Sequence, residues 1–171
     1  MSIAAEWSVF WLNVFVYALL VPVRMQVDVW LPDACFDPNR WWFRTRDWER
    51  DGDVYRDRLR IDRWKDRLPT VTSLNRFSKR RLAGNDQPYL ERFVLETCRA
   101  ESNHVRAILS VVVMQLWTPP GVWVICFVLA FSGNLPFILI QRHNRPRLQR
   151  ALERIAGRTL PRSGEPDLQF A

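Results

Sequence analysis

Glu101 and His104 form the first pair in this sequence whose residue types and spacing suggest chemistry. On a helix, residues three apart lie on the same face, so the carboxylate can reach the imidazole ring and orient it. A histidine near its ordinary pKa suits a general base that takes a proton from a hydroxyl group. The same two residues can instead solvate a helix end at an interface, and spacing alone does not separate the two interpretations. Glu101 and His104 are the candidate catalytic residues.

A second polar group surrounds the end of the apolar run 121–140. Arginines and amides follow the run at once, and Asn134 lies inside it, within a polar break at 132–136. Such groups can donate to a phosphate or an oxyanion, although arginines at a helix end also anchor it to anionic lipid. An amide in hydrocarbon needs a partner, so we expect Asn134 to face the helix that carries His104. The candidate substrate-binding residues are Arg99, Asn134, Gln141, Arg142, Asn144, Arg145 and Lys65.

Metal and redox chemistry find no support in the residue pattern. The chain has two histidines, whereas a carboxylate-bridged metal site needs a second Glu-x-x-His and further carboxylates on facing helices. The three cysteines have no spacing that suits a metal site or a disulfide framework. Glycine-rich phosphate-binding motifs are also missing from the sequence. We therefore expect no metal and no cofactor apart from a co-substrate.

Hydropathy divides the chain into four segments of a single membrane-embedded domain, residues 1–171. Residues 1–23 carry one charge, Glu6, and supply about 20 residues that span a hydrocarbon core of roughly 30 Å as a helix. The other segments are predicted to be an interfacial cytoplasmic insert at 24–87, a helical hairpin at 88–140 and a basic cytoplasmic tail at 141–171.

The insert has the patterns of a membrane interface. Residues 29–43 are rich in tryptophan and proline, which favours a loop at headgroup depth. Residues 47–68 place apolar side chains among dense charges, which predicts a short amphipathic helix or helical hairpin. Residues 70–85 are predicted to form a loop.

Residues 88–117 are predicted to form one long helix with a polar first half and an apolar second half. The apolar part, 105–117, is too short to span a bilayer unless the helix tilts or Arg106 lengthens it by snorkelling. A Thr-Pro-Pro-Gly turn at 118–121 then reverses the chain into the run 121–140. The expected fold is all-α, with about three membrane helices, the last two forming a hairpin, and amphipathic interfacial helices on the cytoplasmic face.

Charge predicts the orientation in the membrane. The formal net charge is +7, and the basic residues lie between Arg24 and Arg106 and in the tail. The positive-inside rule then places the N-terminus outside and both the insert and the C-terminus in the cytoplasm of a bacterial inner membrane, which makes the chain multi-pass. Nucleic acid is disfavoured as a partner, because the charges of the insert nearly balance and its aromatic residues suit a lipid interface.

Four stretches of the chain carry a resemblance to a known family. They are Leu31-Pro32-Asp33 with Phe36, Arg63-Trp64-Lys65-Asp66, Glu96-Thr97-Cys98-Arg99-Ala100-Glu101 with His104, and Asn134-Leu135-Pro136 continuing through Gln141-Arg142-His143-Asn144-Arg145-Pro146-Arg147. In order, spacing and placement against the apolar runs, they resemble the small bacterial glycosyl-4,4'-diaponeurosporenoate acyltransferases, which acylate a glycosylated carotenoid acid in staphyloxanthin biosynthesis. The resemblance is nearly end to end, and the last two stretches are its most specific part.

The resemblance implies a membrane acyltransferase. It would move a fatty acyl group from an acyl thioester, with acyl-CoA as the expected co-substrate, to a sugar hydroxyl of a glycolipid or glycosylated carotenoid. The family usually has Trp where this chain has Val105 and Tyr where it has His143, so His143 is not the catalytic candidate and the acceptor is open. The alternative is a non-catalytic membrane subunit, or a lipid-binding partner of a larger cell-envelope enzyme.

Overall fold

The chain folds into helices that run along one another. The computed structural model describes residues 2–68 and 87–159, and regular structure in those ranges is helical throughout. The long helices are α1 (Ile3–Trp30), α3 (Gln87–Met114) and α4 (Pro120–Thr159), and α2 (Asp53–Leu59) is short. Four 3-10 turns complete the description: η1 (Asp33–Phe36), η2 (Asp47–Gly52), η3 (Ile61–Arg63) and η4 (Lys65–Arg67). The predicted all-α class is confirmed.

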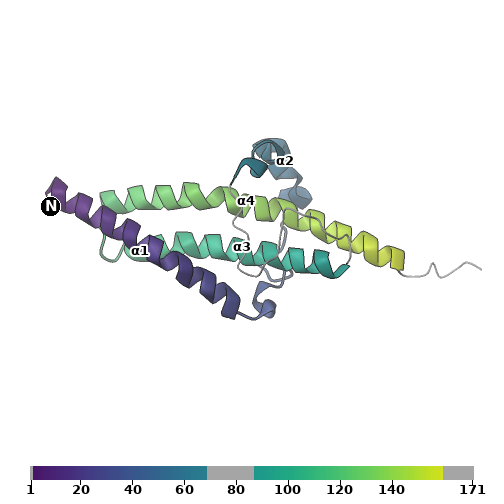
Figure 1. Cartoon of the computed structure of the whole chain (residues 1–171). Helices are drawn as coiled ribbons and strands as arrows, with labels where there is room; N and C mark the ends of the chain where they lie inside the picture. Colours follow the sequence, from purple (N-terminus) through teal and green to yellow (C-terminus); the bar gives the residue numbers. More distant parts are fainter. Residues whose placement is uncertain (1, 69–86, 160–171) are drawn as a thin grey trace, which may run out of the picture.

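Helices α3 and α4 form the long axis of the molecule. They lie side by side and are joined by a short connection, while α1 crosses them obliquely (Figure 1). The core between the three helices is apolar near the connection, where it contains Val111, Met114, Val122, Cys126 and Ala130. At the other end, η2 and α2 pack against α4, and η1 packs against α3. The insert therefore surrounds only one end of the helix pair.

Two helices are long and apolar enough to cross a membrane. They are Ile3–Trp30 and Pro120–Ala156, with mean hydropathies of 1.6 and 2.2 over their most apolar windows. Their outer faces expose large apolar side chains, among them Trp7, Trp11, Phe15, Val128 and Leu129. Soluble monomers rarely expose so much contiguous apolar surface, which supports membrane association. The third membrane segment, expected from residues 105–117, stays a prediction.

The first helix is longer than the sequence predicted. It continues past residue 23 to Trp30. The reason is a set of polar contacts with α3: Asp28 pairs with Arg106, and Arg24 donates to the hydroxyl of Ser110 at 3.4 Å. Because α3 offers Asp28 an opposite charge and Arg24 a hydrogen-bond acceptor, these residues do not end the helix, and both are buried.

The polar residues at 132–136 do not interrupt the helix, and the helix continues beyond residue 140 into the segment predicted to be a basic tail. Helix α4 runs without interruption through Pro136 and Pro146 to Thr159, and residues 160–171 lie outside the described part of the chain. Pro136 removes one backbone donor, but one lost hydrogen bond in a 40-residue helix packed along α3 is too small a cost to end it. Beyond Ile140, burial of His143 and Arg145 extends the packed face of the helix.

The interfacial insert is less regular than expected. In place of an amphipathic helix or hairpin over 47–68, the chain forms the seven-residue α2 between 3-10 turns. Left-handed backbone at Arg50, Asp51, Gly52 and Arg60 causes these interruptions. The long helix predicted at 88–117 ends three residues early, at Met114. The loop predicted at 70–85 lies outside the described residues.

Candidate active site

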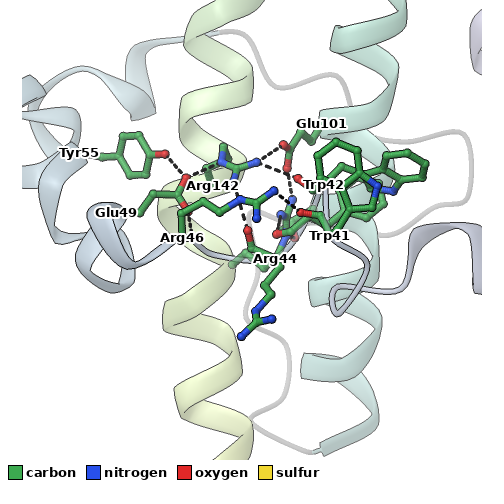
Figure 2. Close-up of polar contacts among 11 residues, drawn as sticks. Trp41, Trp42, Arg44, Arg46, Glu49, Tyr55, Glu101 and Arg142 are labelled. Atoms are coloured by element: carbon green, nitrogen blue, oxygen red, sulfur yellow. Dashed lines mark hydrogen bonds and ion pairs between the residues drawn. The ribbon is translucent and has the colours of Figure 1, made fainter.

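The end of the helix pair near the insert contains a cluster of charged side chains centred on Arg142. Its Nε donates to Oε1 of Glu49 at 2.6 Å, and its Nη1 donates to Oε1 of Glu101 at 2.7 Å (Figure 2). The same guanidinium donates to the backbone carbonyls of Trp42 and Arg44 at 3.1 and 3.3 Å. Arg142 thus joins α4 to α3, to η2 and to the loop at 41–44.

Arg145 lies one turn further along the same face of α4. Its Nη2 pairs with Oε2 of Glu101, its Nε donates to the hydroxyl of Thr97 at 3.1 Å, and its Nη1 donates to the carbonyl of Phe43 at 2.7 Å. Thr97 and Glu101 are four residues apart, so they present one face of α3 to this arginine. Arg145 is only 1% exposed. Both oxygens of Glu101 are consequently paired with arginines.

Burial and pairing shift the pKa values of two groups in the insert. Burial pushes the pKa of the Glu49 carboxyl upward, but hydrogen bonds from Arg142, Tyr55 and the Arg46 backbone outweigh it and hold the pKa below its ordinary value. Burial and the bond to Glu49 raise the pKa of Tyr55 well above its ordinary value. Glu49 is therefore a carboxylate, and Tyr55 a phenol, at neutral pH.

His143 belongs to the packing between α4 and the insert. Its side chain is fully buried, with Nδ1 at 3.1 Å from the carbonyl of Gly52 and Nε2 at 3.3 Å from Asp62. Gly52 has a φ of +87°, and a Cβ there would lie 2.9 Å from the backbone oxygen of His143. Glycine is required at this position for both reasons.

The remaining candidates from the sequence lie apart from one another. Arg99 pairs with Glu96 and, at 2.7 Å, with Asp33, and its guanidinium covers the ring of Phe36. Lys65, in η4, lies 3.7 Å from the carboxylate of Asp62 in η3. Gln141 and Asn144 are partly buried on α4. The structure thus brings Arg142 and Arg145 together around Glu101, whereas Arg99 and Lys65 take part in separate ion pairs.

A second polar contact lies deeper along α3 and α4. His104 Nδ1 is 2.9 Å from Oδ1 of Asn134, and the imidazole ring stacks on Phe137 with centroids 4.8 Å apart. Asn134 Nδ2 donates to the hydroxyl of Tyr17 at 2.9 Å and to the carbonyl of Ala130 at 2.7 Å. The expectation that Asn134 faces the helix carrying His104 is confirmed. The group at Nδ1 of His104 is this amide, and not Glu101 as the spacing had suggested.

These contacts define the tautomer of a neutral His104. The carbonyl of Ala130 can only accept, so the NH₂ end of the Asn134 amide must face it. The amide oxygen then faces His104, and the proton of the neutral ring lies on Nδ1. Its lone pair is on Nε2, which is the arrangement a general base needs.

An apolar pocket adjoins this contact. It has a volume of about 360 Å³ and lies between α1, α3 and α4, with Asn134 and Tyr17 among its lining residues. Asn13 also lines it, and accepts from the indole of Trp117 at 3.0 Å while donating to the hydroxyl of Thr118 at 2.9 Å. Asn13, Tyr17 and Glu49 were not among the sequence candidates. Asn13 carried a usable signal, because it is a lone amide in an apolar run just as Asn134 is.

Comparison with known proteins gives this geometry a chemical class. The sequence model of the glycosyl-4,4'-diaponeurosporenoate acyltransferase family matches residues 39–154, which is more than half of the chain. The chain belongs to this family. The matched range spans α3 and most of α4 and therefore includes His104, Asn134 and the arginine cluster.

Individual relatives agree with the family model. The glycosyl-4,4'-diaponeurosporenoate acyltransferase of Staphylococcus haemolyticus (strain JCSC1435) is 29% identical over 148 residues, which cover 84% of this chain and 86% of the relative. Its counterpart from Staphylococcus aureus (strain MRSA252) is 30% identical over 152 residues, covering 87% and 88%. No solved structure matches the chain.

Proposed function

We propose that this acyltransferase moves a fatty acyl group from an acyl thioester to a sugar hydroxyl of a glycosylated carotenoid or related glycolipid at the membrane surface. The relatives' names support a glycosylated carotenoid as the acceptor. The observation that carries the proposal is the 2.9 Å contact between His104 Nδ1 and Asn134 Oδ1, which leaves the lone pair of the neutral ring on Nε2. Acyl-CoA is the proposed donor, and the chemistry needs no metal.

The proposed reaction uses His104 twice. Nε2 takes the proton of the sugar hydroxyl as its oxygen attacks the thioester carbonyl carbon. The carbon–sulfur bond of the tetrahedral intermediate then breaks, the thiol leaves with the proton from His104, and the new ester remains on the sugar. Asn134 Oδ1 stabilises the imidazolium that forms between these steps, because it accepts from Nδ1–H.

Glu101, Arg142 and Arg145 enter this proposal as positioning residues. Their charged groups already pair with one another and with backbone carbonyls of the loop at 41–44. A phosphate would have to displace those partners, which is costly for the nearly buried Arg145. The cluster instead fixes the angle and depth of α4 against α3 and thereby the contact between Asn134 and His104.

The proposed orientation puts the insert and the arginine cluster in the cytoplasm, where acyl-CoA is available. The basic flanks of α1 and α4 support this orientation. A cysteine placed near Asp53, with the native cysteines replaced, should react with an impermeant thiol reagent only after the cells are opened. Labelling in intact cells would show that the insert lies outside, opposite to the proposed orientation.

The test of the function is His104→Ala in proteoliposomes supplied with labelled acyl-CoA and the glycosylated carotenoid acid named for the relatives. Loss of a general base should lower turnover by about 10²- to 10⁴-fold. Leu109→Ala, a truncation of an exposed side chain on the same helix, is the matched control and should stay active. Near-normal turnover by folded His104→Ala would remove this residue from the mechanism, and absence of transfer by the unaltered chain would favour the non-catalytic alternative.

A further inference from the structure

The pocket beside His104 has walls from single faces of three helices. Helical neighbours lie three or four residues apart, and the lining residues follow that spacing on each helix. They are Phe10, Asn13, Val14 and Tyr17 on α1, Val111 and Met114 on α3, and Cys126, Leu129, Ala130, Gly133 and Asn134 on α4. The pocket therefore follows one continuous face on each of the three helices.

The two ends of the pocket differ from its middle. Asn134 and Tyr17 lie at one end and are hydrogen-bonded to each other, and Asn134 also contacts His104. Asn13 is at the other end, where it is held by Thr118 and Trp117. Between these amides the walls are almost entirely apolar. The α4 wall from residue 126 to residue 134 is about 12 Å long at the rise of an α-helix.

We propose that this pocket binds the acyl chain of the donor and selects its length. The inference rests on the proposed acyl transfer. The carbonyl end of the chain lies beside Asn134 and His104, and the methyl end points toward Asn13 and Met114. Asn13 limits how deep the chain reaches, because an acyl terminus offers that amide nothing in exchange for its hydrogen-bond partners.

The dimensions favour an acyl chain over the polyene of a carotenoid acceptor. A conjugated polyene is a stiff rod and much longer than about 12 Å. A saturated chain rotates freely about its single bonds and can bend to fit a short apolar space. The pocket also meets the reaction centre at Asn134, where the thioester carbonyl must lie for His104 to deliver a nucleophile to it.

Gly133→Leu tests the proposal by filling the pocket. A Cβ at Gly133 meets nothing within 4 Å, so a larger side chain there enters open space without a clash. Gly121→Leu is the matched control, since its Cβ also meets nothing within 4 Å and it does not line the pocket. For Gly133→Leu we expect kcat/KM with a long-chain acyl-CoA to fall about tenfold or more relative to a short-chain acyl-CoA. Gly121→Leu should keep the original ratio.

A second variant fills the pocket from the opposite wall. Val14→Phe enlarges a lining residue of α1, and Val21→Phe is its control, because both valines are 40% exposed and only Val14 lines the pocket. Val14→Phe should shift the preference toward short donors as Gly133→Leu does. Two variants on different helices guard against a folding defect in one of them.

Three outcomes would overturn the proposal. An unchanged length preference in both filling variants would show that the donor chain lies elsewhere. An equal loss with both donors, or a raised KM for the carotenoid acceptor alone, would assign the pocket to the acceptor. Failure of the proposed function has a different signature, because it appears in the unaltered chain or in His104→Ala whatever the donor length.

Discussion

The arginine cluster and the His104–Asn134 contact lie on the same two helices, but their surroundings differ. Arg142 and Arg145 pair with the carboxylates of Glu49 and Glu101 and donate to backbone carbonyls of the loop at 41–44. His104 contacts the amide of Asn134 and stacks on Phe137, and the apolar pocket begins at Asn134. The charged region joins the helices to the insert. In the proposed function, the region at His104 and Asn134 supplies the base and the space for the reaction.

Removing the central carboxylate should break the charged region outright. Glu101→Leu leaves Arg142 and Arg145 facing each other without their shared partner. Breaking a buried ion pair costs about 3–5 kcal/mol, so we expect little folded protein in detergent by thermal unfolding. Glu91→Leu, an exposed site on the same helix, is the control. A stable but inactive Glu101→Leu enzyme would instead move Glu101 into the reaction centre.

Changing the amide of Asn134 should lower activity more than it lowers stability. Asn134→Leu removes the acceptor for Nδ1–H of His104 and leaves the hydroxyl of Tyr17 without its donor. Loss of such a hydrogen bond is worth about 1–3 kcal/mol, which corresponds to a fall of about fivefold to 160-fold in kcat. Ser132→Ala, an exposed position two residues away, should keep both activity and stability. Full activity of Asn134→Leu would show that the tautomer of His104 is set by another group.

The contact between η2 and α4 can be tested at Gly52. An alanine there must adopt a φ of +87°, and its Cβ would lie 2.9 Å from the backbone oxygen of His143. We expect Gly52→Ala to lower the free energy of unfolding by about 1–3 kcal/mol. Gly121→Ala, with open space around its Cβ, should be neutral or stabilising. Equal behaviour of the two variants would mean that the insert packs less tightly on α4 than this contact implies.

The smallest expected effect is on the pH dependence of stability. The pKa of Glu49 is lower in the folded protein than its ordinary value of 4.5, so its carboxylate stabilises the fold above that pH and loses this contribution as the pH falls through the folded value. Glu49→Gln should therefore be less stable than the unaltered chain near neutral pH, and the difference should shrink as the pH falls below 4.5. Thermal unfolding at both pH values measures it. A constant difference would assign the effect to shape rather than charge.

Several parts of this structure could be predicted from the sequence. Apolar runs identified α1 and the first half of α4, the Thr-Pro-Pro-Gly turn marked the reversal after α3, and a lone amide in hydrocarbon pointed to the contact between Asn134 and His104. Each of these depends on a local pattern with a strong physical cause. The expected acyltransferase family was shown by the comparisons.

Other parts depended on contacts between distant residues. Charges at Arg24 and Asp28 suggested the end of α1, but Arg106 and Ser110 of α3 neutralise or bind them and the helix continues. The arginines after Ile140 suggested a phosphate site and a tail, but Glu49 and Glu101, distant in sequence, bind Arg142 and extend α4. The sequence around a charged residue does not show whether its side chain is buried or which distant residue it pairs with. For this reason the predicted helix ends were wrong where ion pairs form between helices.

Hydrogen bonds from α4 to backbone carbonyls of the loop at 41–44 also fix the position of the tryptophans in this loop. Trp41 and Trp42 are 67% and 50% exposed, and the carbonyls of Trp42 and Phe43 accept from Arg142 and Arg145 (Figure 2). Indoles settle at the height of lipid headgroups. Their backbone is bonded to the helix that carries Asn134, so in the proposed arrangement the depth of His104 below the headgroups would be constant. A sugar hydroxyl at headgroup level would then meet the proposed base at the same depth in each catalytic cycle.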